Sequence, residues 1–101
     1  MLEVHHDDPD LARLEKEAAF TAGFAVPVVK GFRKVMQRLR TVSRKSSLYQ
    51  FGGLGLEQLK GQRKHEHSMR INKKWRLIVE FEGEEPNELV RIKGIENHYG
   101  D

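Results

Sequence analysis

The stretch Leu56–Leu77 (LEQLKGQRKHEHSMRINKKWRL) combines one early glutamate with a dense group of cations. Glu57 precedes a basic turn, and Arg70 and Arg76 follow in two runs that alternate as strands do. A carboxylate can move a proton, and a guanidinium can bind two phosphate oxygens. The stretch therefore predicts a site that holds phosphate and transfers a proton. Further candidate contacts to a polyanion in this stretch are Lys60, Arg63, Lys64, Lys73 and Lys74.

RNA cleavage by side chains alone needs a base for the 2′-hydroxyl, a cation for the phosphorane-like transition state and an acid for the leaving 5′-oxygen. Glu57 is the candidate base, and Arg76 with Arg70 are the candidate phosphate ligands. His98 is the candidate acid, because the ordinary pKa of histidine is about 6.5. Tyr99 could stack on a nucleobase or orient it. The candidate parts for cleavage without metal or cofactor are therefore all present.

These residues also have ordinary structural interpretations. Glu57 could form a surface ion pair with Lys60, which its spacing alone favours. Arg70 and Arg76 could be solvated hairpin charges. A two-residue turn at Lys73–Lys74 would place Arg76 beside Ile71, whereas a three-residue turn would place it beside Arg70. The sequence leaves both registers open.

His65 and His67 would project to one face of a strand and could share a zinc ion. The chain has no cysteine and no clear third ligand, so a pH-sensitive patch on the basic face is the favoured interpretation. No Gly-rich phosphate loop, HExxH pattern or serine nucleophile motif is present.

Charge is strongly segregated along the 101 residues. Residues 1–25 hold six acids and two bases, residues 26–76 fourteen bases and two acids, and residues 77–101 seven acids and two bases. The basic block favours a polyanionic partner such as RNA or DNA, with a merely solvated face as the alternative. The sequence has no membrane-length apolar run, signal pattern or cysteine, so we expect a cytoplasmic protein outside the membrane.

The length predicts one small domain of all 101 residues. Asp8 and Pro9 mark the start of a helix expected to end at Gly23, and Pro27 opens a second amphipathic helix that reaches Arg40. We expect an α+β fold in which these helices pack on one face of a small, mainly antiparallel sheet, whose other face is open and polar. Strands are predicted at Met1–His6, Leu54–Leu59, His67–Asn72, Trp75–Phe81 and Glu88–Ile95.

Four runs of the sequence match a known family: Leu56–Gly61 (LEQLKG) with Arg63, Ser68–Asn72 (SMRIN), Trp75–Leu77 (WRL) and Ile95–Tyr99 (IENHY). In these runs the chain resembles the HigB branch of the RelE-like toxins, which are ribosome-dependent mRNA endonucleases of type II toxin–antitoxin systems. The resemblance implies a RelE-like fold with two helices on a twisted antiparallel sheet. It also implies metal-independent cleavage of mRNA in the ribosomal A site, which leaves a 2′,3′-cyclic phosphate and a 5′-hydroxyl and inhibits translation.

The same resemblance implies roles for individual residues. Glu57 matches a Glu or His that transfers protons, and Arg76 matches the arginine that contacts the scissile phosphate. His98 and Tyr99 match the functional tail, although many HigB-like chains have the order Tyr-His. The basic positions that would grip RNA are matched by Lys60, Arg63 and Arg70.

The implied partners are a HigA-type helix-turn-helix antitoxin, mRNA and the 30S ribosomal subunit, with operator DNA bound only through the antitoxin. Two other functions stay open: a non-catalytic basic protein that binds RNA or DNA, and a module that binds an antitoxin or another helical partner. The first would protect mRNA rather than cut it. The second would lack salt-dependent affinity for RNA.

Overall fold

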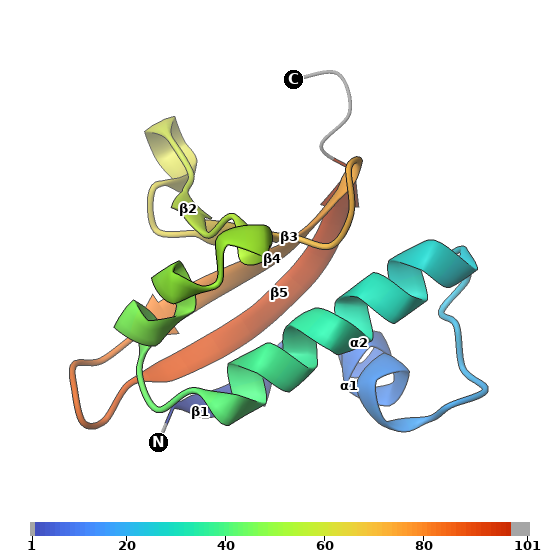
Figure 1. Cartoon of the computed structure of the whole chain (residues 1–101), viewed down its shortest axis with the longest axis horizontal. Helices are drawn as coiled ribbons and strands as arrows, with labels where there is room; N and C mark the ends of the chain where they lie inside the picture. Colours follow the sequence, from blue (N-terminus) through green and yellow to red (C-terminus); the bar gives the residue numbers. More distant parts are fainter. Residues whose placement is uncertain (1, 98–101) are drawn as a thin grey trace.

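The computed structural model describes residues 2–97, in which two helices lie on one side of a curved sheet (Figure 1). The strand order is β1-β5-β4-β3-β2. Neighbouring strands are antiparallel except β1, which pairs with β5 in parallel at the edge. The predicted α+β fold is therefore confirmed. The strands are β1 (Glu3–His6), β2 (Glu57–Gln58), β3 (His67–Arg70), β4 (Trp75–Glu82) and β5 (Leu89–Asn97).

The first helix, α1, spans Pro9–Lys16, which is shorter than the sequence predicts. Its start is as expected, because the Asp8 carboxylate accepts a hydrogen bond from the Asp10 backbone N–H at 2.9 Å. The prediction that it continues to Gly23 is wrong. The chain instead leaves the helix after Lys16 and crosses to α2 through turns.

Arg33, on the second helix α2 (Val26–Thr41), supplies the physical reason for this early end. Its Nε donates to the carbonyl of Leu14 at 2.9 Å, and its Nη2 donates to those of Glu17 at 2.8 Å and Phe20 at 3.1 Å. The last carbonyls of a helix have no partner within the helix. A guanidinium from α2 binds one of them here, that of Leu14, and the carbonyl of the C-cap residue Glu17, so the two helices are joined by polar contacts as well as by apolar packing.

The core lies between the helices and one face of the sheet. Glycine at position 31 lets α2 approach the β3–β4 turn closely, because a Cβ there would lie 2.6 Å from both the Cγ2 and the carbonyl oxygen of Ile71. Alternate residues of β3 and β4 enter this core, as the period-two pattern predicts. The largest fully buried side chains are Phe32, Leu14, Met36, Leu39, Leu48, Met69, Leu77, Ile92, Val79 and Val90.

The predicted strand at Leu54–Leu59 is mostly wrong. Only Glu57–Gln58 pairs, as β2 at the sheet edge. The residues before it form two short 3-10 turns, η1 (Lys45–Gln50) and η2 (Gly52–Leu54), and Gly55 then adopts a left-handed conformation with φ of 54°. Glycine tolerates this conformation, so the glycine-rich sequence bends where a strand was expected. The bend brings the Gly55 carbonyl to the polar face of the sheet.

Candidate active site on the polar face of the sheet

The hairpin of β3 and β4 places Arg70 directly opposite Arg76. This is the register of the three-residue turn, one of the two that the sequence left open. The turn is fixed by Asn72, whose side-chain oxygen accepts hydrogen bonds from the backbone N–H groups of Lys74 and Trp75, both at 2.9 Å. Both arginines therefore lie on the same face of the sheet, away from the core.

Arg76 is buried on this polar face, with 6% of its surface exposed. Its Nε donates to the Ser68 hydroxyl at 3.0 Å, and its Nη2 donates to the Gly55 carbonyl at 2.7 Å. Burial lowers the pKa of Arg76, the nearby carboxylate of Glu57 raises it, and the like charge of Arg70 lowers it again. An arginine still keeps its proton in such a setting. The result is a fixed, poorly solvated cation.

Glu57 stands beside this cation. It lies opposite Ser68 in the β2–β3 ladder, and its Oε1 is 3.6 Å from Nη2 of Arg76. The Glu57 side chain is 58% exposed, so its carboxylate meets both solvent and the guanidinium. The expected ion pair between Glu57 and Lys60 does not form within residues 2–97. The observed carboxylate–guanidinium pair joins a group that can move protons to one that can bind phosphate.

A pocket opens over Arg76, and hydrogen bonds from Arg63 connect segments that line it. The two Nη atoms of Arg63 donate to the Glu96 carboxylate at 2.9 and 2.7 Å, while its Nε donates to Glu66 at 2.7 Å. These two carboxylates raise the pKa of Arg63. Arg63 therefore joins η3 (Gly61–Arg63) to the end of β5, and its charge is already paired. The pocket is lined by Leu59, Arg63, Ser68, Arg76, Ile78, Glu96 and Asn97.

The other predicted contacts to RNA lie around this site. Lys60 and Lys64 flank η3, Lys73 and Lys74 form the β3–β4 turn, and all four are exposed. Arg70 is exposed on the same face as Arg76. The predicted tail residues His98 and Tyr99 lie outside the described residues. Asn97, the last described residue, pairs with Trp75 at the turn end of β4.

Sequence reasoning assigned no role to two residues that shape the pocket. Ser68 positions Arg76, and Glu96 positions Arg63. Ser68 lies two residues before Arg70, so strand periodicity alone could have put the two on one face. Glu96 carries no such signal, because its contact with Arg63 spans 33 residues and depends on the sheet order.

The expectation that His65 and His67 project to one face of a strand, as a zinc site or as a pH-sensitive patch, is wrong. His67 is buried on the core face, where its ring meets Phe81 edge-on at a centroid distance of 5.2 Å. His65 precedes β3 and is exposed. Burial lowers the pKa of His67, and Lys45 lowers it further. Within residues 2–97, no group of three or more His, Cys, Asp or Glu residues could hold a metal ion.

Comparisons with known proteins agree with this architecture. A solved structure described as "YoeB/ParE toxin from Agrobacterium tumefaciens" superposes with a TM-score of 0.60 at 18% identity, over 97% of this chain and 100% of that one. At that identity, the likeness establishes the fold. Comparison with curated proteins found no match. None of the helices within residues 2–97 is long and apolar enough to cross a membrane.

A family model provides the assignment. The model described as "RelE-like toxin of type II toxin-antitoxin system HigB" matches residues 10–95, which include α2, all but the first residue of α1, the Glu57–Arg76 pair and most of β5. The match confirms the resemblance that the sequence motifs indicate. The chain therefore belongs to the HigB-like toxins of type II toxin–antitoxin systems.

Proposed function

We propose that this toxin is an endoribonuclease that cleaves mRNA in the ribosomal A site. The observation that supports the proposal best is the 3.6 Å approach of the exposed Glu57 carboxylate to the buried Arg76 guanidinium. The approach combines a base that solvent and substrate can reach with a fixed phosphate ligand. The family is consistent with this chemistry, because RelE-like toxins are generally endoribonucleases.

The proposed reaction needs only side chains. Glu57 takes the proton of the 2′-hydroxyl, and the resulting 2′-oxygen attacks the adjacent phosphorus. Arg76 stabilises the added negative charge, with Nη1 available because no described residue accepts a hydrogen bond from it. His98 gives its proton to the 5′-oxygen as the P–O bond breaks, and Tyr99 holds the nucleotide in line. The products are a 2′,3′-cyclic phosphate and a 5′-hydroxyl.

The proposed partners follow from the same assignment. A type II toxin implies an antitoxin, and we propose a HigA-type helix-turn-helix protein that carries the complex to operator DNA. Exposed Lys60, Lys64, Lys73 and Lys74 would contact mRNA or the 30S subunit through phosphates. We propose that the toxin acts in the cytoplasm, where mRNA is translated.

Primer extension on an mRNA in a reconstituted translation reaction tests the proposal directly. The wild-type toxin is expected to cut within codons when ribosomes are present and to leave the same mRNA intact without them. Glu57→Gln removes the base and should slow cutting by about 10²–10⁴-fold. Glu84→Gln, in the exposed β4–β5 turn, is the matched control and should cut at the wild-type rate.

Three results would each contradict a different part of the proposal. Cutting that does not depend on ribosomes would move the substrate to free RNA. Unchanged cutting by a folded Glu57→Gln protein would remove Glu57 from the reaction. No cutting by the folded wild-type protein in either condition would contradict the endoribonuclease activity itself.

A further inference from the structure

The arginines of this chain differ in whether an oxygen atom of another residue forms a hydrogen bond or an ion pair with their guanidinium group. Within residues 2–97, Arg38 and Arg70 alone have no carboxylate, carbonyl or hydroxyl partner. Arg38 lies against the Phe51 ring at 4.9 Å, and no partner of any kind is found for Arg70. A guanidinium group has five N–H donors, so Arg38 and Arg70 have donors for an acceptor on a ligand. The arginines with oxygen partners are Arg13, Arg33, Arg40, Arg44, Arg63, Arg76 and Arg91.

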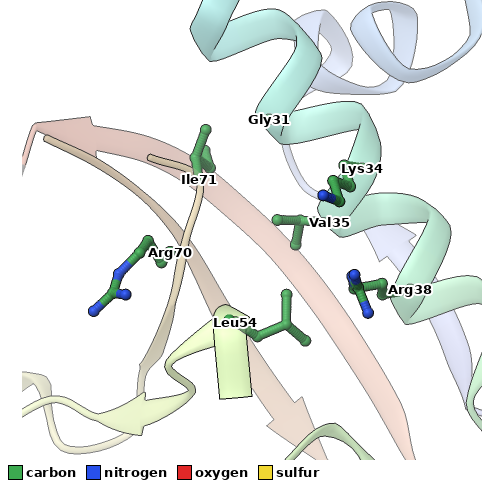
Figure 2. Close-up of a pocket in the computed structure, with 8 residues that line it drawn as sticks. Gly31, Lys34, Val35, Arg38, Leu54, Arg70 and Ile71 are labelled. Atoms are coloured by element: carbon green, nitrogen blue, oxygen red, sulfur yellow. The ribbon is translucent and has the colours of Figure 1, made fainter. Parts of the chain in front are cut away.

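Both of these arginines line one cleft between α2, η2 and β3, shown in Figure 2. We call this the α2 cleft, and its lining residues are Gly31, Lys34, Val35, Arg38, Gly53, Leu54, Arg70 and Ile71. Among residues 2–97, no acidic residue lines this cleft. A neighbouring hollow shares Lys34 and Arg38 and continues along α2 to Phe51. The α2 cleft therefore carries three basic side chains, and the hollow beside it reaches an aromatic ring.

Arg70 connects the α2 cleft to the candidate active site. In Figure 2 its guanidinium points away from α2, whereas Lys34 and Arg38 project from α2 itself. A Cβ built on Gly55 would lie 3.8 Å from Nη2 of Arg70 and 3.8 Å from Nη1 of Arg76. The two guanidinium groups thus flank one glycine. Arg70 therefore borders the α2 cleft while its guanidinium lies beside that of Arg76.

We propose that the α2 cleft binds backbone phosphates of the same single-stranded RNA whose scissile phosphate lies at Arg76. The inference rests on the proposed function and extends it to how the substrate runs across the protein. A strand that crosses Arg70 would neutralise two arginines that lack an acceptor, and a base could stack on Phe51. An acidic protein segment would match the charge, but Arg70 borders the cleft and also lies beside Arg76, which favours RNA.

Binding of a non-cleavable, fully 2′-O-methylated RNA to the full-length toxin tests this inference without relying on catalysis. The double variant Lys34→Gln/Arg38→Gln should bind at least about 10-fold more weakly, and the slope of log affinity against log salt should fall by about 1.4, at 0.7 per phosphate contact. The matched control is Arg13→Gln/Lys16→Gln, which removes one arginine and one lysine from exposed positions on α1. It should keep most of the wild-type affinity.

A second series locates the contact on the RNA. One phosphate at a time is replaced by a neutral methylphosphonate. A single position, or two adjacent ones, should weaken binding to the wild-type protein but not weaken binding to the double variant any further. Losses that add at every position would contradict the inference, because they would show that the cleft and the phosphate do not interact.

The remaining outcomes separate this inference from the proposed function. If the wild type cuts mRNA while the double variant binds RNA as tightly as the wild type, the inference is wrong and the nuclease stands. If the wild type binds through the cleft but never cuts, the nuclease is wrong and the binding site stands. If the double variant keeps RNA affinity but loses the antitoxin, the cleft is a protein-docking site and the inference is wrong.

Discussion

Arg76, the phosphate ligand in the proposed reaction, is a cation that the sheet holds in place. Two of its nitrogens are held by Ser68 and Gly55, and burial removes most of the water around the third. A charge that is already fixed and poorly hydrated loses little when phosphate arrives. Ser68 is therefore a positioning residue, whose hydroxyl orients the guanidinium of Arg76.

Replacing Ser68 tests this role. Ser68→Ala removes the acceptor for Nε of Arg76, so mRNA cleavage should fall by about 10–100-fold while the thermal midpoint changes little. Ser68→Thr keeps the hydroxyl and should restore most of the activity. Rates from the primer-extension assay, together with circular dichroism melting curves, distinguish positioning from folding. Equal activity of the alanine and threonine variants would contradict the role of Ser68.

Contacts between individual residues are also what the sequence predicts least well. The motif could indicate that Glu57 and Arg76 belong to one site, because both residue types suit phosphate chemistry. It could not show that Arg63 is already paired with Glu66 and Glu96. That pairing depends on which strands are neighbours, and the order of strands is a property of the whole sheet.

At the scale of elements, hydrogen bonds from Arg33 join α2 to the end of α1 and to the turns that follow it. One guanidinium serves the carbonyls of Leu14, Glu17 and Phe20. Arg33→Ala should lower the free energy of unfolding by about 2 kcal/mol, because hydrogen bonds to charged groups contribute about 1.5–3 kcal/mol. Urea denaturation measures the change. Lys30→Ala, an exposed position on the same helix, should stay within about 0.5 kcal/mol of wild type.

The contact between α2 and the β3–β4 turn gives a second prediction for elements. Gly31→Ala improves helix propensity by about 1 kcal/mol but places a methyl group against the backbone of Ile71. Overpacking costs about 1–3 kcal/mol, so the variant should be less stable than wild type in urea. The control is Gly94→Ala, where an added Cβ meets nothing within 4 Å. A more stable Gly31→Ala variant would show that α2 can move away from the turn.

Elements were predicted well where periodicity decides them and poorly where contacts across the fold decide them. The apolar spacing of α2 and the alternation of β4 can be read directly from the sequence, and both form as expected. The end of α1 depends on Arg33, which lies 19 residues after Leu14. The bend at Gly55 is stabilised by its hydrogen bond to Arg76, 21 residues away. Neither distant partner could be identified from local pattern.

For the whole molecule, buried His67 predicts how stability depends on pH. Its pKa is below 6.5 in the folded protein, so the unfolded chain binds a proton first as the pH falls through that value. Stability should therefore decrease from pH 7.5 to pH 5.5. The pKa of Glu15 is also lowered, but this carboxylate affects stability only below its ordinary pKa of 4.5, which lies outside the range from pH 7.5 to pH 5.5.

Urea denaturation of His67→Leu at both pH values tests this expectation. The variant should lose less stability on acidification than wild type does. His65→Gln is the control, because it removes a neighbouring exposed histidine without altering the core. An identical pH dependence of wild type and His67→Leu would show that His67 is not responsible.

The parallel pairing of β1 with β5 has a consequence for the timing of synthesis. β5 (Leu89–Asn97) lies between β1 and β4, although β1 is made first and β5 last among the strands. The emerging chain therefore cannot close its sheet until Leu89–Asn97 has left the exit tunnel. Contacts between such distant segments form slowly, because the long loop between them must close first. The face that carries Glu57 and Arg76 therefore gains β5, the strand that joins β4 to β1, only after the other described strands have been made.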